Sequence, residues 1–295
     1  MYVATLIAEP GKLDAQTAEN LRNAWGGSII NFLSLYEAAE FLLSMHPSNF
    51  NEVWVDFQAM GIDLVLQKEN NRRKKLLIAD MDSTIIEQEC IDELAQEAGV
   101  GEAVRKITAK AMNGEIDFSE ALVERMALLK GTSQDIIKTV IEQRLSYVSG
   151  ADILVATMKA NGAYTALVSG GFTVFTEHVS LKLGFDEHRA NTLLIKDALL
   201  TGEVAKPILG GQAKFEALDD LTTRLSIKDD DVIAVGDGAN DLAMLGSAGM
   251  GVAMHAKPAV GATCDFKINF GDLSALLYLQ GFSKDEFIVP RFLRK

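Results

Sequence analysis

Short apolar runs that alternate with helical stretches constrain the fold of this 295-residue chain more than any other feature. The segments "AYTALVSGG" and "DVIAVGDGAND" each hold such a run, followed by Gly, Ser or Asp, and "AGMGVAM" holds a third run. Helical patterns at 150–160, 172–183, 211–224 and 239–247 accompany them. This alternation is typical of βαβ units around a parallel sheet. We therefore predict an α/β fold with a Rossmann-like parallel sheet and helices on both faces.

A helical insertion of about 87–147 is predicted between the first strand of this sheet, in "KLLIAD", and the second. Asp117 and Glu120 have the spacing of a capping box, which predicts a helix start there. On the following helix Arg125 interrupts an apolar face that includes Phe118 and Leu122. An isolated arginine of this kind usually extends to solvent or pairs with an acidic neighbour. The alternative is a small cap that carries one anion-binding residue over a cleft.

Residues 1–70 read as a separate α+β domain, and 71–295 as the domain that contains the parallel sheet and the cap. The first domain has strands in "YVATLIA", "GSIINFLS" and 62–67, with a helix at 13–24. The basic segment "KENNRRKK" is predicted to be a linker with solvated charges. "NTLLIKDALLTGEV" favours a hairpin appended to the parallel sheet, and the C-terminal segment favours a packed helix with a tail.

The net charge of −13 argues against a nucleic-acid or anionic-membrane partner, since both recruit clustered Lys and Arg. Cys90, Cys264 and the four scattered histidines lack the spacing of a disulfide framework or a zinc site. A metal would therefore have oxygen ligands. The N-terminus lacks a basic signal region, and the most apolar stretch is interrupted by glutamates. We expect a soluble, cytoplasmic protein.

Polar residues follow three of the predicted strands, at the edge where an open parallel sheet binds its ligands. They are Asp80 and Asp82, then Ser169 and Gly170, then Asp237, Asn240 and Asp241. Two carboxylates at the end of one strand repel each other unless a cation lies between them. Asp80, Asp82 and Asp237 together would form an oxygen-rich site for Mg²⁺.

A carboxylate can also attack phosphorus, provided that a second acid protonates the leaving oxygen. Asp80 and Asp82 lie on the same side of an extended segment, as such a pair requires. Ser169, Gly170 and Lys214 are the candidates for holding phosphate oxygens. Each of these features alone has a bland explanation: a polar strand end, a turn, or a solvated lysine. Their agreement along one sheet edge favours phosphoryl transfer.

These residues resemble the four motifs of the haloacid dehalogenase superfamily: D-x-D-S-T from Asp80, then Ser169, Lys214 and GDGAND. Within it, residues 75–271 resemble the phosphoserine phosphatase family through "DMDSTIIEQECIDELA", "ITAKAMNGEIDFSEALVERMALLKG" and "VSGGFTVFTEHV". The N-terminal domain is similar to the ACT-like domains of some members. It has no ligand signature, so a role in stabilising the fold or a homodimer stands beside a role as amino-acid sensor.

The resemblance implies that Asp80 is the nucleophile and a Mg²⁺ ligand. Asp82 would be the general acid and then the base, with its backbone carbonyl on the metal. Asp237 would be the second carboxylate ligand, supported by Asp241, and Asn240 would line the site.

The resemblance further implies that Ser169, Gly170 and Lys214 hold the phosphoryl group. In the cap, Glu89 would bind the substrate ammonium and Arg125 its carboxylate, and two residues would form an apolar lid, Met112 and Phe118.

The expected activity is Mg²⁺-dependent hydrolysis of O-phospho-L-serine to L-serine and phosphate through an aspartyl phosphate, the last step of serine biosynthesis. Two alternatives stay open at this point. One is a phosphatase or phosphotransferase of the same superfamily that acts on another small phosphomonoester. The other is an amino-acid-binding regulatory protein with a vestigial phosphatase domain.

Overall fold

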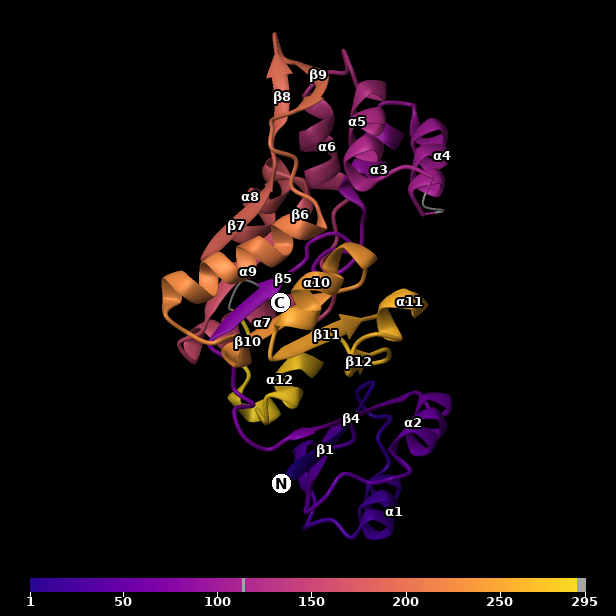
Figure 1. Cartoon of the computed structure of the whole chain (residues 1–295), viewed down its shortest axis with the longest axis vertical. Helices are drawn as coiled ribbons and strands as arrows, with labels where there is room; N and C mark the ends of the chain where they lie inside the picture. The colour runs from indigo at the N-terminus through magenta and orange to yellow at the C-terminus, as the bar shows by residue number, and fades with distance from the viewer. Residues whose placement is uncertain (113–114, 291–295) are drawn as a thin grey trace.

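A six-stranded parallel sheet forms the centre of the molecule in the computed structural model, which describes residues 1–112 and 115–290 (Figure 1). Its strand order is β12-β11-β10-β5-β6-β7. In chain order the strands are β5 (Leu76–Ala79), β6 (Tyr164–Phe172), β7 (Glu187–Asn191), β10 (Val232–Gly236), β11 (Met250–Met254) and β12 (Phe266–Ile268). The predicted α/β class with a parallel sheet is confirmed.

Helices cover both faces of this sheet because alternate strand residues point to opposite sides. Leu77 and Ala79 face the core that contains α7, α8 and α12, whereas Leu76 and Ile78 face the core that contains α9 and α10. The helices are α7 (Ala151–Ala160), α8 (Thr173–Leu183), α9 (Gly211–Leu225), α10 (Leu242–Ser247), α11 (Pro258–Gly261) and α12 (Ala275–Leu279). No helix in the described part of the chain combines the length and apolar character needed to cross a membrane.

The insertion after β5 is helical, as predicted, and forms a cap at one end of the molecule (Figure 1). It contains α3 (Cys90–Glu97), α4 (Gly101–Met112), α5 (Phe118–Leu128) and α6 (Asp135–Gln143). Helix α5 begins with the expected capping box, in which the Glu120 amide donates to Asp117 Oδ1 at 2.8 Å and the Asp117 amide donates to Glu120 Oε2 at 3.2 Å. These bonds satisfy two amides that a helix start otherwise leaves unpaired.

The predicted hairpin exists as β8 (Leu193–Lys196) and β9 (Leu199–Val204), but it is not appended to the parallel sheet. The two strands form a sheet of their own beside α5 and α6 (Figure 1). The Gly131 amide donates to the Leu200 carbonyl at 2.8 Å, and the Leu200 amide donates to the Thr132 carbonyl at 2.9 Å. The hairpin therefore extends the cap, because its hydrogen-bonding edge meets the loop between α5 and α6.

The N-terminal unit is an ACT-like βαββαβ arrangement with an antiparallel sheet in the order β2-β3-β1-β4. It comprises β1 (Tyr2–Ala8), α1 (Ala15–Trp25), β2 (Asn31–Ser34), β3 (Ala38–Leu43), α2 (Phe50–Ala59) and β4 (Ile62–Lys68). The sequence did not predict β3 or α2. A three-residue turn divides one apolar stretch into β2 and β3, and Tyr36 adopts a left-handed φ of 62° there.

The two faces of the N-terminal sheet bury different neighbours. Leu6, Phe41 and Leu64 pack with α1 and α2, whereas Ile7 and Val65 belong to the same apolar cluster as the core around α12. This sheet therefore lies between its own helices and the rest of the chain, and its second face is part of the larger core.

The charges of the segment between β4 and β5 are not all solvated, so that prediction is wrong. The Arg72 side chain is only 12% exposed and pairs with Glu40 at 2.6 Å. Its Nε also donates to the Leu279 carbonyl at 3.1 Å, and Arg73 lies 3.9 Å above the Phe282 ring. The charges join the N-terminal sheet to the C-terminal segment, which a pattern of like charges along the sequence cannot reveal.

We expect Ile7→Ala to destabilise the whole chain, since Ile7 is buried in the shared core. Truncation of a buried isoleucine to alanine costs about 2–5 kcal/mol of the free energy of unfolding. Guanidinium chloride unfolding followed by circular dichroism measures the loss. Leu181→Ala, at a leucine that is 79% exposed, is the matched control and should change stability by at most about 0.5 kcal/mol. Equal stabilities of the two variants would contradict the shared core.

Candidate active site

The polar residues predicted at the strand ends meet at one edge of the parallel sheet. Strands β10, β5 and β6 are neighbours, so the residues that follow them lie side by side. Asp80 follows β5, Ser169 and Gly170 lie near the end of β6, and Asp237 follows β10. The short turn η2 (Ala239–Asp241) brings Asp241 back toward the same point.

Lys214 forms a buried ionic contact with two of these aspartates. Its Nζ lies 2.6 Å from Asp80 Oδ1 and 2.6 Å from Asp241 Oδ1, and the side chain is 1% exposed. Helix α9 supplies this lysine from its first turn. Although burial disfavours the charged amine, Asp80 and Asp241 raise the pKa of Lys214 above its usual range. The lysine is thus held as a cation.

Asp80 is buried, and its Oδ1 accepts hydrogen bonds from Lys214 and from the amide of Met81 at 2.7 Å. Burial raises the pKa of Asp80 well above its usual range, Asp241 and Asp82 add to the increase, and Lys214 opposes it. One buried ammonium therefore does not neutralise the surrounding carboxylates.

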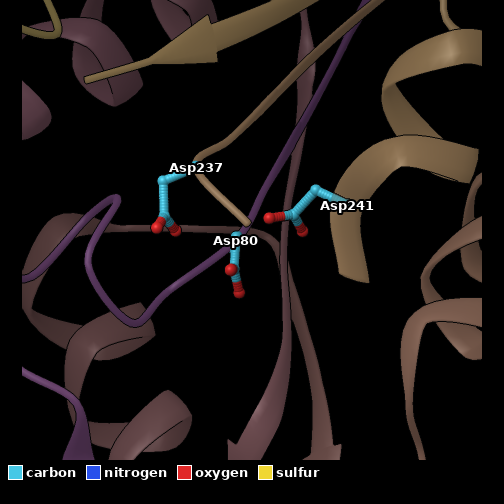
Figure 2. Close-up of side chains that lie close together, drawn as sticks. All are labelled: Asp80, Asp237 and Asp241. Carbon is cyan, nitrogen blue, oxygen red and sulfur yellow. The ribbon is translucent and has the colours of Figure 1, made fainter. Parts of the chain in front are cut away.

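Three buried carboxylates form a group that could hold a metal ion. Asp80, Asp237 and Asp241 each offer one oxygen, and these oxygens lie within 4.8 Å of one another; Figure 2 shows the three side chains close together. Burial also raises the pKa of Asp237, and the ammonium of Lys257, whose Nζ lies 3.7 Å from Asp237 Oδ2, opposes this increase. Oxygen donors with excess negative charge suit a hard divalent cation. The Asp82 carboxylate, which the sequence placed in this group, instead accepts hydrogen bonds from Cys90 and Ser169. Metal binding by the backbone carbonyl of Asp82 stays a prediction.

The Asp82 carboxylate joins the sheet edge to the cap. Its Oδ1 accepts a hydrogen bond of 2.8 Å from the amide of Cys90, the first residue of α3, and its Oδ2 accepts one of 2.8 Å from Ser169 Oγ. A Cβ atom at Gly171 would lie 2.8 Å from Asp82 Oδ2, so a larger residue there would displace the carboxylate from this position. Asp82 thereby contacts both the start of the cap and the Ser169 hydroxyl.

Asn191 is a site residue that the sequence did not indicate. Its side chain is 2% exposed. Nδ2 donates to the carbonyls of Gly170 at 2.9 Å and Leu209 at 3.0 Å, and Oδ1 accepts from the Leu209 amide at 2.8 Å. These bonds fix the end of β6 against the segment that leads into α9 and Lys214. The sequence offered no local signal for this role, because Asn191 was only the first residue of the predicted hairpin.

Phe118 reaches from the cap to the sheet edge. Cβ atoms built on Gly170 and Gly210 would lie 2.9 Å and 3.0 Å from its ring, so the ring covers both backbones. The other predicted lid residue, Met112, ends α4, and its side chain lies outside the described residues. Asn240 is half-buried and immediately precedes Asp241 in η2.

Charged residues of the cap surround Arg125, which is partly buried. Burial lowers the pKa of Arg125, and the nearby carboxylates of Asp92 and Glu89 oppose that shift. Glu89 Oε1 accepts a hydrogen bond of 2.9 Å from Ser83 Oγ. Sequence reasoning missed Asp92, whose Oδ1 is buried and has no hydrogen-bond partner among the residues that the structure describes. The cap thus presents one cation and an adjacent anion close to the sheet edge.

The fold and this site define a class of hydrolase. The chain belongs to the haloacid dehalogenase-like hydrolase family, whose pattern matches residues 77–246.

The names of its relatives are more specific than that of the family. The chain is 44% identical to a probable phosphoserine phosphatase of Schizosaccharomyces pombe, in an alignment of 216 residues that covers 72% of each protein. It superimposes with a TM-score of 0.86 on a haloacid dehalogenase family hydrolase from Salmonella enterica serovar Typhi, at 30% identity over 97% of this chain and 100% of that one. A phosphoserine phosphatase solved as a phospho-aspartyl intermediate analogue gives a TM-score of 0.65 at 40% identity, over 70% of this chain and 98% of the other.

We expect Mg²⁺ to stabilise the protein, because the three buried carboxylates carry more charge than Lys214 offsets. At 100 times its dissociation constant the ion should add about 2.7 kcal/mol to the free energy of unfolding. Thermal unfolding in MgCl₂ and in chelator measures the difference. Asp237→Asn should reduce the shift, and Asp56→Asn on the exposed side of α2 should retain it. An unchanged melting temperature of the native chain would contradict a metal site here.

Proposed function

We propose that this chain is a Mg²⁺-dependent phosphoserine phosphatase that hydrolyses O-phospho-L-serine to L-serine and phosphate. The observation that carries the proposal is the buried group of Asp80, Lys214, Asp237 and Asp241 beneath a cap that presents Glu89 and Arg125. The identity to proteins named phosphoserine phosphatase supports the same substrate. This reaction is the last step of serine biosynthesis.

Asp80 is the nucleophile in the proposed mechanism. Its Oδ1 is engaged by Lys214 and the Met81 amide, so we assign the attack on phosphorus to Oδ2. The bond from phosphorus to the serine oxygen breaks as the new bond to Asp80 forms, which gives an aspartyl phosphate. The solved analogue of a phospho-aspartyl intermediate in a relative supports this step.

Asp82 is the general acid and base. Its position next to Ser169 and at the start of α3 puts a carboxyl group between the sheet edge and the cap, where the leaving serine oxygen would be. It donates a proton to that oxygen in the first step. In the second step it accepts a proton from the water that attacks phosphorus, and phosphate leaves Asp80.

Fixed donors stabilise the negative charge on the transferring group. Lys214 supplies a permanent cation, and Ser169 and Gly170 supply a hydroxyl and a backbone amide. Asp80 and Asp237, with the Asp82 carbonyl and Asp241 in support, would hold Mg²⁺. The ion would neutralise developing charge on phosphate oxygens and keep the Asp80 carboxylate ionised.

The cap selects the amino-acid part of the substrate. A zwitterion needs one fixed anion and one fixed cation, and Glu89 and Arg125 provide them. Phe118 covers Gly170 and excludes bulk water while the acyl phosphate exists. Met112 is proposed as the second lid residue from the resemblance. A phosphatase for sugar phosphates is disfavoured, because those substrates offer neither charge to the cap.

We expect Asp80→Asn to abolish phosphate release from L-phosphoserine, because an amide is a poor nucleophile. Loss of a nucleophile lowers turnover by at least about 10³-fold. Phosphate release is measured with L-phosphoserine, phosphothreonine and a sugar phosphate, in Mg²⁺ and in chelator, and Asp56→Asn is the matched control.

A strong, metal-dependent preference of the native chain for phosphoserine supports the proposal. Turnover by Asp80→Asn would exclude Asp80 as nucleophile. Equal turnover of the sugar phosphate would leave the chemistry intact but refute the substrate, in favour of the alternative of another small phosphomonoester.

Arg125→Gln should lower the selectivity for phosphoserine over O-phosphoethanolamine, which lacks the carboxylate. Loss of a charged hydrogen bond costs about 1.5–3 kcal/mol, or roughly 10- to 100-fold in the ratio of kcat/KM values. Kinetics with both substrates measure the ratio. Arg144→Gln is the control, since Arg144 pairs with Glu93 and Glu97 in the same cap. A fall in kcat/KM that is equal for both substrates would refute carboxylate recognition by Arg125.

A further inference from the structure

Asp63 of the N-terminal sheet holds a loop that belongs to the other part of the chain. It lies on β4 and is 0% exposed. Its Oδ1 accepts a hydrogen bond from the Asn269 amide at 2.7 Å, and its Oδ2 accepts from the amides of Phe270 at 3.0 Å and Gly271 at 2.8 Å. These three residues directly follow β12. One buried carboxylate of the N-terminal unit therefore fixes three consecutive amides of the loop.

The same loop contacts the end of β11 through His255. The carbonyl of Gly271 accepts a hydrogen bond of 2.8 Å from His255 Nε2, and the His255 amide donates to the Ile268 carbonyl at 2.8 Å. His255 has a φ of 44°, a left-handed conformation that is uncommon for residues other than glycine and that contacts with the surroundings stabilise. The loop held by Asp63 is part of those surroundings.

The turn at His255 reaches the metal-binding group two residues later. The Lys257 amide donates to the Asp237 carbonyl at 3.2 Å, and Lys257 Nζ lies 3.7 Å from Asp237 Oδ2. A continuous set of contacts thus runs from Asp63 through the loop and His255 to Asp237, one of the three carboxylates at the site.

We propose that Asp63 is a positioning residue for the metal site, which acts through Gly271 and His255 on the turn that holds Asp237. The N-terminal unit then contributes to metal affinity, in addition to burying the apolar surface between the two sheets. This inference rests on the metal site of the proposed function but not on its substrate.

Other contacts between the same two parts of the chain lead away from the site and serve as a comparison. Gln67 Nε2, on the same face of β4 as Asp63, donates to the Leu279 carbonyl at 2.7 Å, and Arg72 contacts that carbonyl as well. Leu279 ends α12 and does not belong to the 255–257 turn. Loss of the Gln67 contact weakens docking of the N-terminal unit without altering the support of Asp237.

The test measures binding of Mn²⁺, used in place of Mg²⁺, by electron paramagnetic resonance on the full chain. Variants are Asp63→Asn, His255→Ala, the two combined, and Gln67→Ala as the matched control, with a melting temperature for each. Changes in groups that support metal ligands cost roughly 10- to 100-fold in affinity, and we expect about tenfold for Asp63→Asn and for His255→Ala. The double variant should lose little more than either single variant, since both break one set of contacts.

The outcomes separate this inference from the proposed function. Gln67→Ala should lower the melting temperature and leave the Mn²⁺ dissociation constant within about twofold of the native value. Unchanged affinity in Asp63→Asn, additive losses in the double variant, or an equal loss in Gln67→Ala would overturn the inference while leaving the metal site in place. If Asp63→Asn does not fold, unchanged affinity in His255→Ala alone overturns it. Absence of Mn²⁺ binding by the native chain overturns the inference together with the proposed metal site.

Discussion

Excess negative charge at one buried point is the constraint on which the rest of this structure depends. Asp80, Asp237 and Asp241 converge there, and Lys214 is the buried cation that contacts two of them. Such a group is costly without compensation, because burial disfavours each charged carboxylate. The strands of the sheet, the η2 turn and the first turn of α9 each contribute one part of it. The fold keeps these elements at the same sheet edge, where a metal ion would complete the charge balance.

The sequence allowed the central fold to be predicted because its signals are local. Strands β5, β6 and β10 each contain an apolar run followed by polar residues, and their parallel pairing brings Asp80, Ser169 and Asp237 together. The capping box at Asp117 is likewise a local pattern, and the structure contains it. The sequence therefore predicted the site residues that directly follow these strands.

What the sequence could not provide depends on contacts between distant segments. Asn191 joins Gly170 to Leu209, and Arg72 reaches Leu279, more than 200 residues away. Strand β3 was missed because β2 and β3 lie in one apolar stretch, divided only by a short turn at Tyr36. In each case the partner that gives the residue its role lies outside any local window, so residue type and periodicity do not identify it.

The hairpin of β8 and β9 gives the cap a third attachment. The helical insertion is connected through the chain to β5 at one end and to α7 at the other, and the loop between α5 and α6 is also hydrogen-bonded to β9. The hairpin begins two residues after Asn191, whose side chain bonds Gly170 and Leu209, a residue of the segment that leads into α9. Any rotation of the cap relative to the sheet would therefore either break the bonds to β9 or displace the chain beside Asn191 and Gly170. The cap is therefore tied by hydrogen bonds to a hairpin that lies in the chain between Asn191 and Leu209, so a movement of the cap would be transmitted to the backbone that it covers.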